Sequence, residues 1–157
     1  MSPDEKARID RDRRLREREA RTGRVVHDLT KMGRGVDEIL AHLFIRPMTL
    51  PQLHAAMVQE RTTTREEFTR RYIERAPDPY DSDIPMEYRV DHTILYDVGQ
   101  LATASILETD GTGELQISDR DGVRVFLRAA FYRGQHEPGW GFRNELNSRL
   151  HQEGATA

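Results

Sequence analysis

Cysteine is absent from the 157 residues of this chain. A chain without thiols cannot form a disulfide framework, a thiolate zinc site, an iron–sulfur cluster or a cysteine nucleophile. Long apolar stretches are also missing. No run approaches the roughly 18 residues of a membrane-spanning helix, and the first residues contain no apolar segment of a secretory signal. We therefore expect a cytoplasmic protein without a membrane partner.

Apolar residues are few relative to charged ones, at 36% hydrophobic and 32% charged residues. This composition is polar for a globular domain, but it is not polar enough for a wholly disordered chain. The length fits one domain. We predict a modest core with a solvated appendage.

The N-terminal segment carries most of the excess positive charge. Residues 1–35 hold 11 basic and 7 acidic side chains, a net charge of +4. The other 122 residues hold 13 basic and 20 acidic side chains, a net charge of −7. Pairs such as Asp10–Arg14 and Glu17–Arg21 have the i, i+4 spacing that supports a helix. Only Ile9, Leu15 and Ala20 are apolar between Ile9 and Arg21, so this helix has almost no face to bury.

Residues 1–22 therefore have two interpretations. The simpler one is a solvated basic helix outside the core, because the interleaved acids weaken its positive field. The other is a basic arm that lies on nucleic acid or on an acidic partner. After this arm we predict a single domain at residues 23–151 and a flexible tail at residues 152–157.

The strongest helical pattern lies at residues 36–44, where apolar residues recur at i, i+3, i+4, i+7 and i+8. Pro47 ends this helix, because proline disfavours helical geometry at the residue before it. Thr49 and Gln52 then form a capping box that begins a second helix. We expect three apolar residues of this second helix to face the core: Leu50, Leu53 and Met57.

A second capping box, formed by Thr63 and Glu66, predicts a separate helix to about residue 76. Residues 77–87 alternate prolines with aspartates, which indicates an acidic surface loop. Asp81 and Asp83 could bind a divalent cation. Two acids in such a loop are more often simply exposed, so we predict no metal site.

The second half of the chain predicts a helix, a hairpin and two more helices. Val90, Ile94, Leu95 and Val98 have helical spacing, which predicts a helix through about Val98. Two β-prone runs within residues 105–118 flank a glycine-rich turn, as in a β-hairpin. Residues 123–131 repeat the helical pattern, with a strand as the minor alternative. A short last helix carries Phe142, Leu146 and Leu150.

This order of elements resembles the winged-helix superfamily of helix-turn-helix proteins. Residues 39–53 are similar to the first two helices of many winged-helix transcriptional regulators, and residues 106–127 to their wing and the helix after it. The resemblance covers about residues 36–133 and carries no invariant signature. It implies an α+β, mostly helical fold, with a winged-helix-like core between a solvated N-terminal helix and a short C-terminal one. In the family, a recognition helix enters the DNA major groove and the wing touches the backbone or minor groove.

The wing of this chain departs from the DNA-binding pattern. Residues 106–117 contain Glu108, Asp110 and Glu114 and no lysine or arginine. A phosphate backbone would repel this charge, and phosphate contacts supply much of the non-specific affinity for DNA. The helix before the wing offers only Arg89 and His92, so residues 61–75 form the better basic surface.

Catalytic motifs are lacking. The six histidines are scattered, and no two share one helix at the i, i+4 spacing of zinc ligands. No Gly-x-Ser-x-Gly elbow occurs, and the glycines at positions 111 and 113 are too few for a phosphate-binding loop. We predict a protein that is not an enzyme and that holds neither a metal nor a cofactor.

Two hypotheses for function follow. The first is a winged-helix DNA-binding protein, a transcriptional regulator or mobile-element accessory factor, that forms a homodimer through its terminal helices. The second is a non-enzymatic adaptor, or a phage or virion assembly protein. It would bind a protein partner through the N-terminal helix, the acidic wing, or an aromatic loop with Trp140 and Phe142. The residues expected to contact DNA are Arg13, Arg14, Arg18, Arg61, Arg65, Arg70, Arg71 and Arg75.

Overall fold

The computed structural model describes residues 1–32, 35–72, 85–133 and 143–156, with the backbone alone for 64–72, 131–133, 143–144 and 152–156. The fold class is confirmed in its coarse form, because the described chain is mostly helical with one two-stranded antiparallel sheet. The elements are α1 (Pro3–Thr30), α2 (Gly35–Ile45), α3 (Leu50–Tyr72), α4 (Met86–Thr93), η1 (Ile94–Val98), α5 (Gly99–Thr103), β1 (Leu107–Thr109), β2 (Leu115–Ile117), α6 (Arg120–Arg133) and α7 (Arg143–Thr156).

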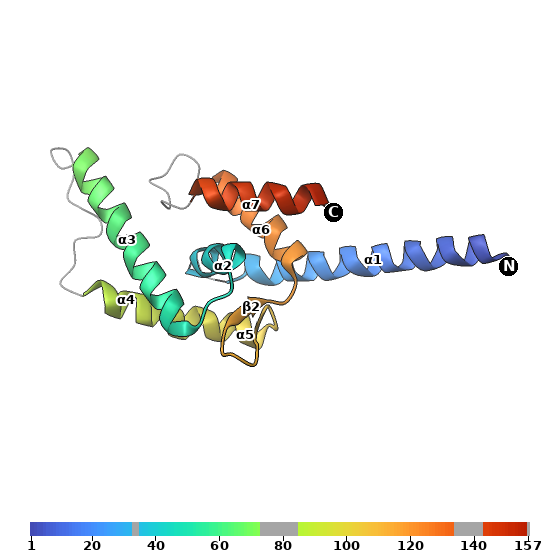
Figure 1. Ribbon diagram of the computed structural model, residues 1–157, viewed down its shortest axis with the longest axis horizontal. Helices are drawn as coiled ribbons and strands as arrows, with labels where there is room; N and C mark the ends of the chain where they lie inside the picture. The colour runs from blue at the N-terminus through green and yellow to red at the C-terminus, as the bar shows by residue number, and fades with distance from the viewer. Residues whose placement is uncertain (33–34, 73–84, 134–142, 157) are drawn as a thin grey trace.

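Helix α1 is continuous across the position at which the sequence pattern changes. Its first turn is capped by Ser2, whose hydroxyl accepts a hydrogen bond from the Glu5 amide at 3.2 Å. The predicted arm and the amphipathic turns after it therefore form one helix. Its N-terminal half projects beyond the rest of the molecule, whereas its C-terminal half lies along α6 and buries Leu29 (Figure 1).

Helix α2 lies at the centre of the fold, in contact with α3, η1, β2, α6 and α7. The apolar residues of its predicted helical pattern are all buried, which confirms that interpretation. The first capping box is also confirmed. The Thr49 amide donates to Gln52 Oε1 at 3.0 Å, and the Gln52 amide donates to the Thr49 hydroxyl at 3.3 Å. The capped helix turns Leu53 and Met57 into the core, but Leu50 is 46% exposed, contrary to prediction.

The predicted helix start at Thr63 is wrong, because α3 runs through this position without a break. The Thr62 hydroxyl donates to the Val58 carbonyl at 2.8 Å, and the Thr63 hydroxyl donates to the Gln59 carbonyl at 3.0 Å. Bonds to the carbonyl four residues earlier let threonine sit inside a helix instead of capping a new one.

Elements α4, η1 and α5 form one continuous helical segment that begins inside the predicted loop, after Pro85. The rest of that loop, including Asp81 and Asp83, lies outside the described residues. The segment extends past Val98 to Thr103 and has π-helical geometry at η1. A π-helical turn inserts extra backbone and rotates the side chains after it. Val90 and Leu101 are buried, whereas Leu95, which belongs to the predicted helical pattern, is exposed to solvent.

The predicted hairpin is confirmed, with Leu107 opposite Ile117 and Thr109 opposite Leu115. Its turn contains Gly113 at a φ of 85°, a left-handed conformation that favours glycine. The Leu115 amide also donates to the Met48 carbonyl at 2.7 Å. This bond ties the connection between α2 and α3 to the hairpin.

The last two helices close the core. Val123, Phe126 and Leu127 of α6 are buried, so the helical interpretation is confirmed over the strand. Gly122 approaches α1 so closely that a Cβ there would lie 2.8 Å from Val25 Cβ. In α7, Leu146 and Leu150 are buried, and the helix continues to Thr156, through most of the segment interpreted as a tail.

Candidate functional site

Two of the arginines expected to contact DNA form ion pairs that join separate helices. Arg61 Nε lies 2.9 Å from Glu38 Oε1, and Arg61 Nη2 lies 2.8 Å from Glu38 Oε2 and 3.1 Å from the Thr93 hydroxyl. This fork joins α2, α3 and α4. Arg18 Nη2 lies 2.6 Å from Asp121 Oδ2 and joins α1 to α6. Both guanidinium groups thus have structural contacts that binding to phosphate would have to replace.

The other predicted residues are not brought together. Arg13 and Arg14 are exposed on the projecting half of α1, and Arg13 lies 3.6 Å from Asp10. Arg65, Arg70 and Arg71 belong to the part of α3 for which only the backbone is described. Three further residues lie outside the described chain: Arg75, Trp140 and Phe142.

The Arg61–Glu38 pair belongs to a polar cluster between α2, α3 and the α4–η1 segment. Asp97 of η1 faces Gly35 so closely that a Cβ at position 35 would collide with its carboxylate. Burial raises the pKa of Asp97, and Glu38 raises it further, while Arg61 acts in the opposite direction. These contacts hold the π-helical turn against the start of α2, which is a structural role.

Replacing Arg61 with alanine is expected to lower the free energy of unfolding by about 1–3 kcal/mol, between the typical costs for exposed and buried ion pairs. The Arg61 and Glu38 side chains are only 25% and 14% exposed. The substitution therefore leaves the largely buried Glu38 carboxylate without its ion-pair partner. Urea denaturation measures the loss. Arg13→Ala, in the exposed 3.6 Å pair, is the control and should change stability by less than about 0.5 kcal/mol. Equal effects of the two substitutions would contradict this role for Arg61.

Large side chains form an exposed stripe on α4 and η1, which sequence reasoning missed. Tyr88, Leu95 and Tyr96 are 68%, 75% and 59% exposed. His92 is also exposed, and its ring centroid lies 4.7 Å from that of Tyr96. We call these four residues the α4–η1 stripe. The four-residue spacing of Tyr88, His92 and Tyr96 was the available signal, since such positions share one side of a helix.

Acidic side chains surround the α4–η1 stripe. Glu87 and Asp91 are exposed on the same helix, and Asp91 Oδ1 lies 3.0 Å from His54 Nε2. The whole segment from Met86 to Thr103 contains one arginine, Arg89, and no lysine. The exposed side of the α4–η1 segment therefore presents aromatic and apolar side chains with negative charges beside them.

The acidic hairpin turn is organised by Asp110. Its carboxylate accepts hydrogen bonds from the Thr112 hydroxyl at 2.5 Å, the Thr112 amide at 2.8 Å and the Glu114 amide at 3.0 Å. These hydrogen bonds hold the pKa of Asp110 below its ordinary value, and the bond from the Thr112 hydroxyl has the largest effect. The turn thus keeps its negative charge, and Glu108 beside it is exposed.

No three His, Asp or Glu side chains gather to hold a metal ion in the part of the chain that the structure describes. None of the helices described there combines the length and apolarity needed to cross a membrane. Comparisons of the chain with protein-family models, with curated proteins and with solved structures found no match.

Proposed function

We propose that this protein is a non-enzymatic protein-interaction module on a winged-helix-like scaffold, and that the α4–η1 stripe is its binding face. The order of elements supports the scaffold. Helix α2 is followed by a proline-containing turn, α3, the α4–α5 segment and the β1–β2 hairpin, an order that resembles that of winged-helix domains. The bridge between Met48 and Leu115 ties the turn before α3 to this hairpin.

The main observation in support of this proposal is the exposure of Tyr88, Leu95 and Tyr96. The helical segment before the hairpin is one candidate for a DNA-reading helix in this resemblance, and here its exposed side is aromatic and apolar. Binding to DNA depends on lysine and arginine contacts to phosphates. Contiguous exposed apolar side chains instead mark contact sites for proteins, where tyrosine is among the residues that contribute most to affinity.

The charges beside the α4–η1 stripe define the chemistry of the partner. Glu87 and Asp91 flank it on the helix, and both are exposed. Complementary interfaces place opposite charges together, which raises association rates and rejects partners of the wrong sign. We therefore expect a protein segment that presents apolar side chains flanked by lysine or arginine.

Substitution of the α4–η1 stripe is expected to weaken partner binding without unfolding the protein. Leu95→Glu and Tyr96→Ala should each weaken binding by about 30-fold or more, the effect of losing an interface hot spot. The tagged wild-type chain and both variants are incubated with an extract of the native cell. Proteins that they retain in stoichiometric amounts are identified by mass spectrometry, and their affinities are then measured with purified partner.

Leu50→Glu is the control, because Leu50 is also an exposed leucine, although less exposed than Leu95, and lies on α3 outside the stripe. It should retain the partner. A partner that all variants bind equally, or recovery of DNA with no stoichiometric protein, would contradict the proposed binding face.

DNA binding is the second candidate function, favoured by the order of elements and by the exposed Arg13 and Arg14 on α1. It predicts fluorescence-anisotropy binding of mixed-sequence duplexes at low ionic strength, where even weak electrostatic association is detectable. Charge removal by Arg13→Gln and Arg14→Gln should flatten the salt dependence, since each lost phosphate contact removes about 0.9 from the log–log slope. No binding at low salt would rule this candidate out.

A further inference from the structure

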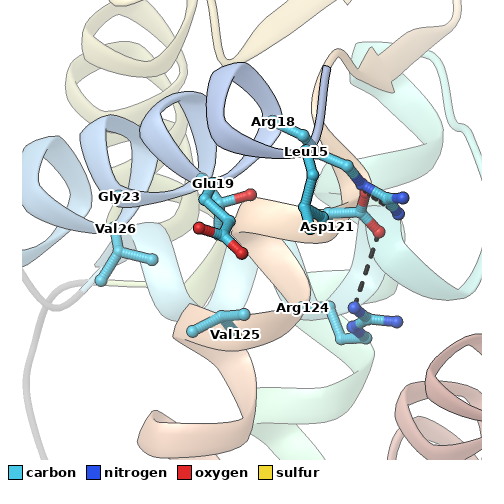
Figure 2. A pocket seen from close by; sticks show the side chains of 9 residues that line it. Leu15, Arg18, Glu19, Gly23, Val26, Asp121, Arg124 and Val125 are labelled. Carbon is cyan, nitrogen blue, oxygen red and sulfur yellow. Dashed lines mark hydrogen bonds and ion pairs between the residues drawn. The ribbon is translucent and has the colours of Figure 1, made fainter. Parts of the chain in front are cut away.

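A groove of about 500 Å³ lies between α1 and α6, away from the α4–η1 stripe. Leu15 and Val26 of α1 and Val125 of α6 form its apolar part, and Glu19 extends between the two helices (Figure 2). Leu15 is 55% exposed, and Val125 is also exposed. No ion pair involves Glu19 among the described residues. We call this feature the α1/α6 groove.

The N-terminal half of α1 is the second observation. It extends past the body of the molecule as a free helix, and its only large apolar side chains, Ile9 and Leu15, are exposed (Figure 1). Helices draw most of their stability from packing of an apolar face against other elements. Helix α1 has 28 residues and is about 42 Å long, and half of this length lacks such packing and leaves Ile9 and Leu15 uncovered.

We propose that the α1/α6 groove is occupied by α1 of a second copy of this chain, in an antiparallel pair related by a two-fold axis near Leu15. The charge distribution along α1 selects this occupant and this direction. With the axis at Leu15, an antiparallel pair places Arg11 of one copy opposite Glu19 of the other, and Asp12 opposite Arg18. These opposite charges lie three and four residues from Leu15, on the side of the helix that makes the contact. A parallel pair would place each of these residues opposite the same residue of the other copy, and so opposite a like charge.

The positions of the side chains suit the same arrangement. Arg8, Leu15 and Thr22 are spaced by seven residues and therefore share one side of α1. With the axis at Leu15, Leu15 meets its counterpart and Arg8 of each copy lies opposite Thr22 of the other. Gly23 lies beside Thr22, and a Cβ added there would meet nothing within 4 Å, so a second helix can approach closely. This surface is on different elements from the α4–η1 stripe, so the inference does not rest on the proposed function.

Light scattering and sedimentation of the full chain test the oligomeric state. The wild type should be a dimer, and Leu15→Glu and Val125→Glu should each raise the dimer dissociation constant by about 30-fold or more, because each places a charge in the apolar contact. Leu50→Glu, at a leucine of similar exposure outside the groove, should stay dimeric. Circular dichroism verifies that each variant is folded. A monomeric wild type, or a dimer that both groove variants leave intact, would overturn the proposal.

Cross-linking tests the direction of the helices, and the absence of native cysteine makes it specific. Leu15→Cys should form a disulfide between copies on mild oxidation, whereas Leu50→Cys should not. A mixture of Arg8→Cys and Thr22→Cys chains should give the mixed disulfide. Disulfides between two Arg8→Cys chains would indicate parallel helices and overturn the antiparallel pair, as would failure of Leu15→Cys to cross-link in a dimeric sample.

Discussion

Acidification from about pH 7 to about pH 5 is expected to remove about 2 kcal/mol from the free energy of unfolding through His42 alone. His42 is buried in α2, at the centre of the fold. Burial, followed by the charges of Arg46 and Arg61, lowers its pKa from 6.5 to about 4. The protein thus holds a neutral imidazole at a pH where the unfolded chain is already protonated.

The direction of the effect follows from proton binding in the two states. Between the folded pKa of about 4 and the unfolded value of 6.5, the unfolded chain binds more protons at His42 than the folded chain. Stability therefore rises with pH through this window. The full contribution is present above the unfolded pKa and is lost as the pH falls toward the folded one.

Urea denaturation at a series of pH values measures this effect for the wild type and for His42→Gln. The difference between their unfolding free energies should change by about 2 kcal/mol across the window, because the variant lacks the titrating group. His151→Gln, at an exposed histidine of α7, should follow the wild type. A difference between wild type and His42→Gln that is independent of pH would contradict the assignment.

Phe44→Ala is expected to lower the free energy of unfolding by about 3–5 kcal/mol, the usual cost of deleting a buried aromatic ring. Phe44 is a fully buried residue of α2. The Arg120 guanidinium carbon lies 4.1 Å from its ring centroid, and Arg120 Nη2 donates to the Phe44 carbonyl at 2.8 Å. Loss of the ring therefore leaves a cavity and removes the surface on which the first side chain of α6 rests.

Thermal and urea unfolding measure the Phe44 effect. Phe44→Leu keeps most of the buried volume and should cost less than Phe44→Ala, while Leu50→Ala, at an exposed site, should cost about 0.5 kcal/mol or less. A loss below about 1 kcal/mol for Phe44→Ala would mean that α2 is not at the centre of the core.

The sequence by itself determined the elements whose signals are local. The apolar spacing of α2, the Thr49–Gln52 capping box and the glycine turn of the hairpin each involve residues that are close in the chain. These elements can form without contacts to distant segments of the chain. For the same reason the sequence determined that the described chain is mostly helical with one hairpin.

The environment of each candidate site residue was decided only by the tertiary structure. Arg61 looked like a free cation, because nothing near it in the chain reveals that Glu38 and Thr93 converge on it from α2 and α4. Leu95 belongs to the apolar pattern with Val90 and Ile94, but only the packing of the segment showed that its side chain is exposed. Likewise, only the packing of α6 against α1 created the groove beside Leu15. Spacing along one helix cannot encode such contacts, because they depend on how separate elements meet in space.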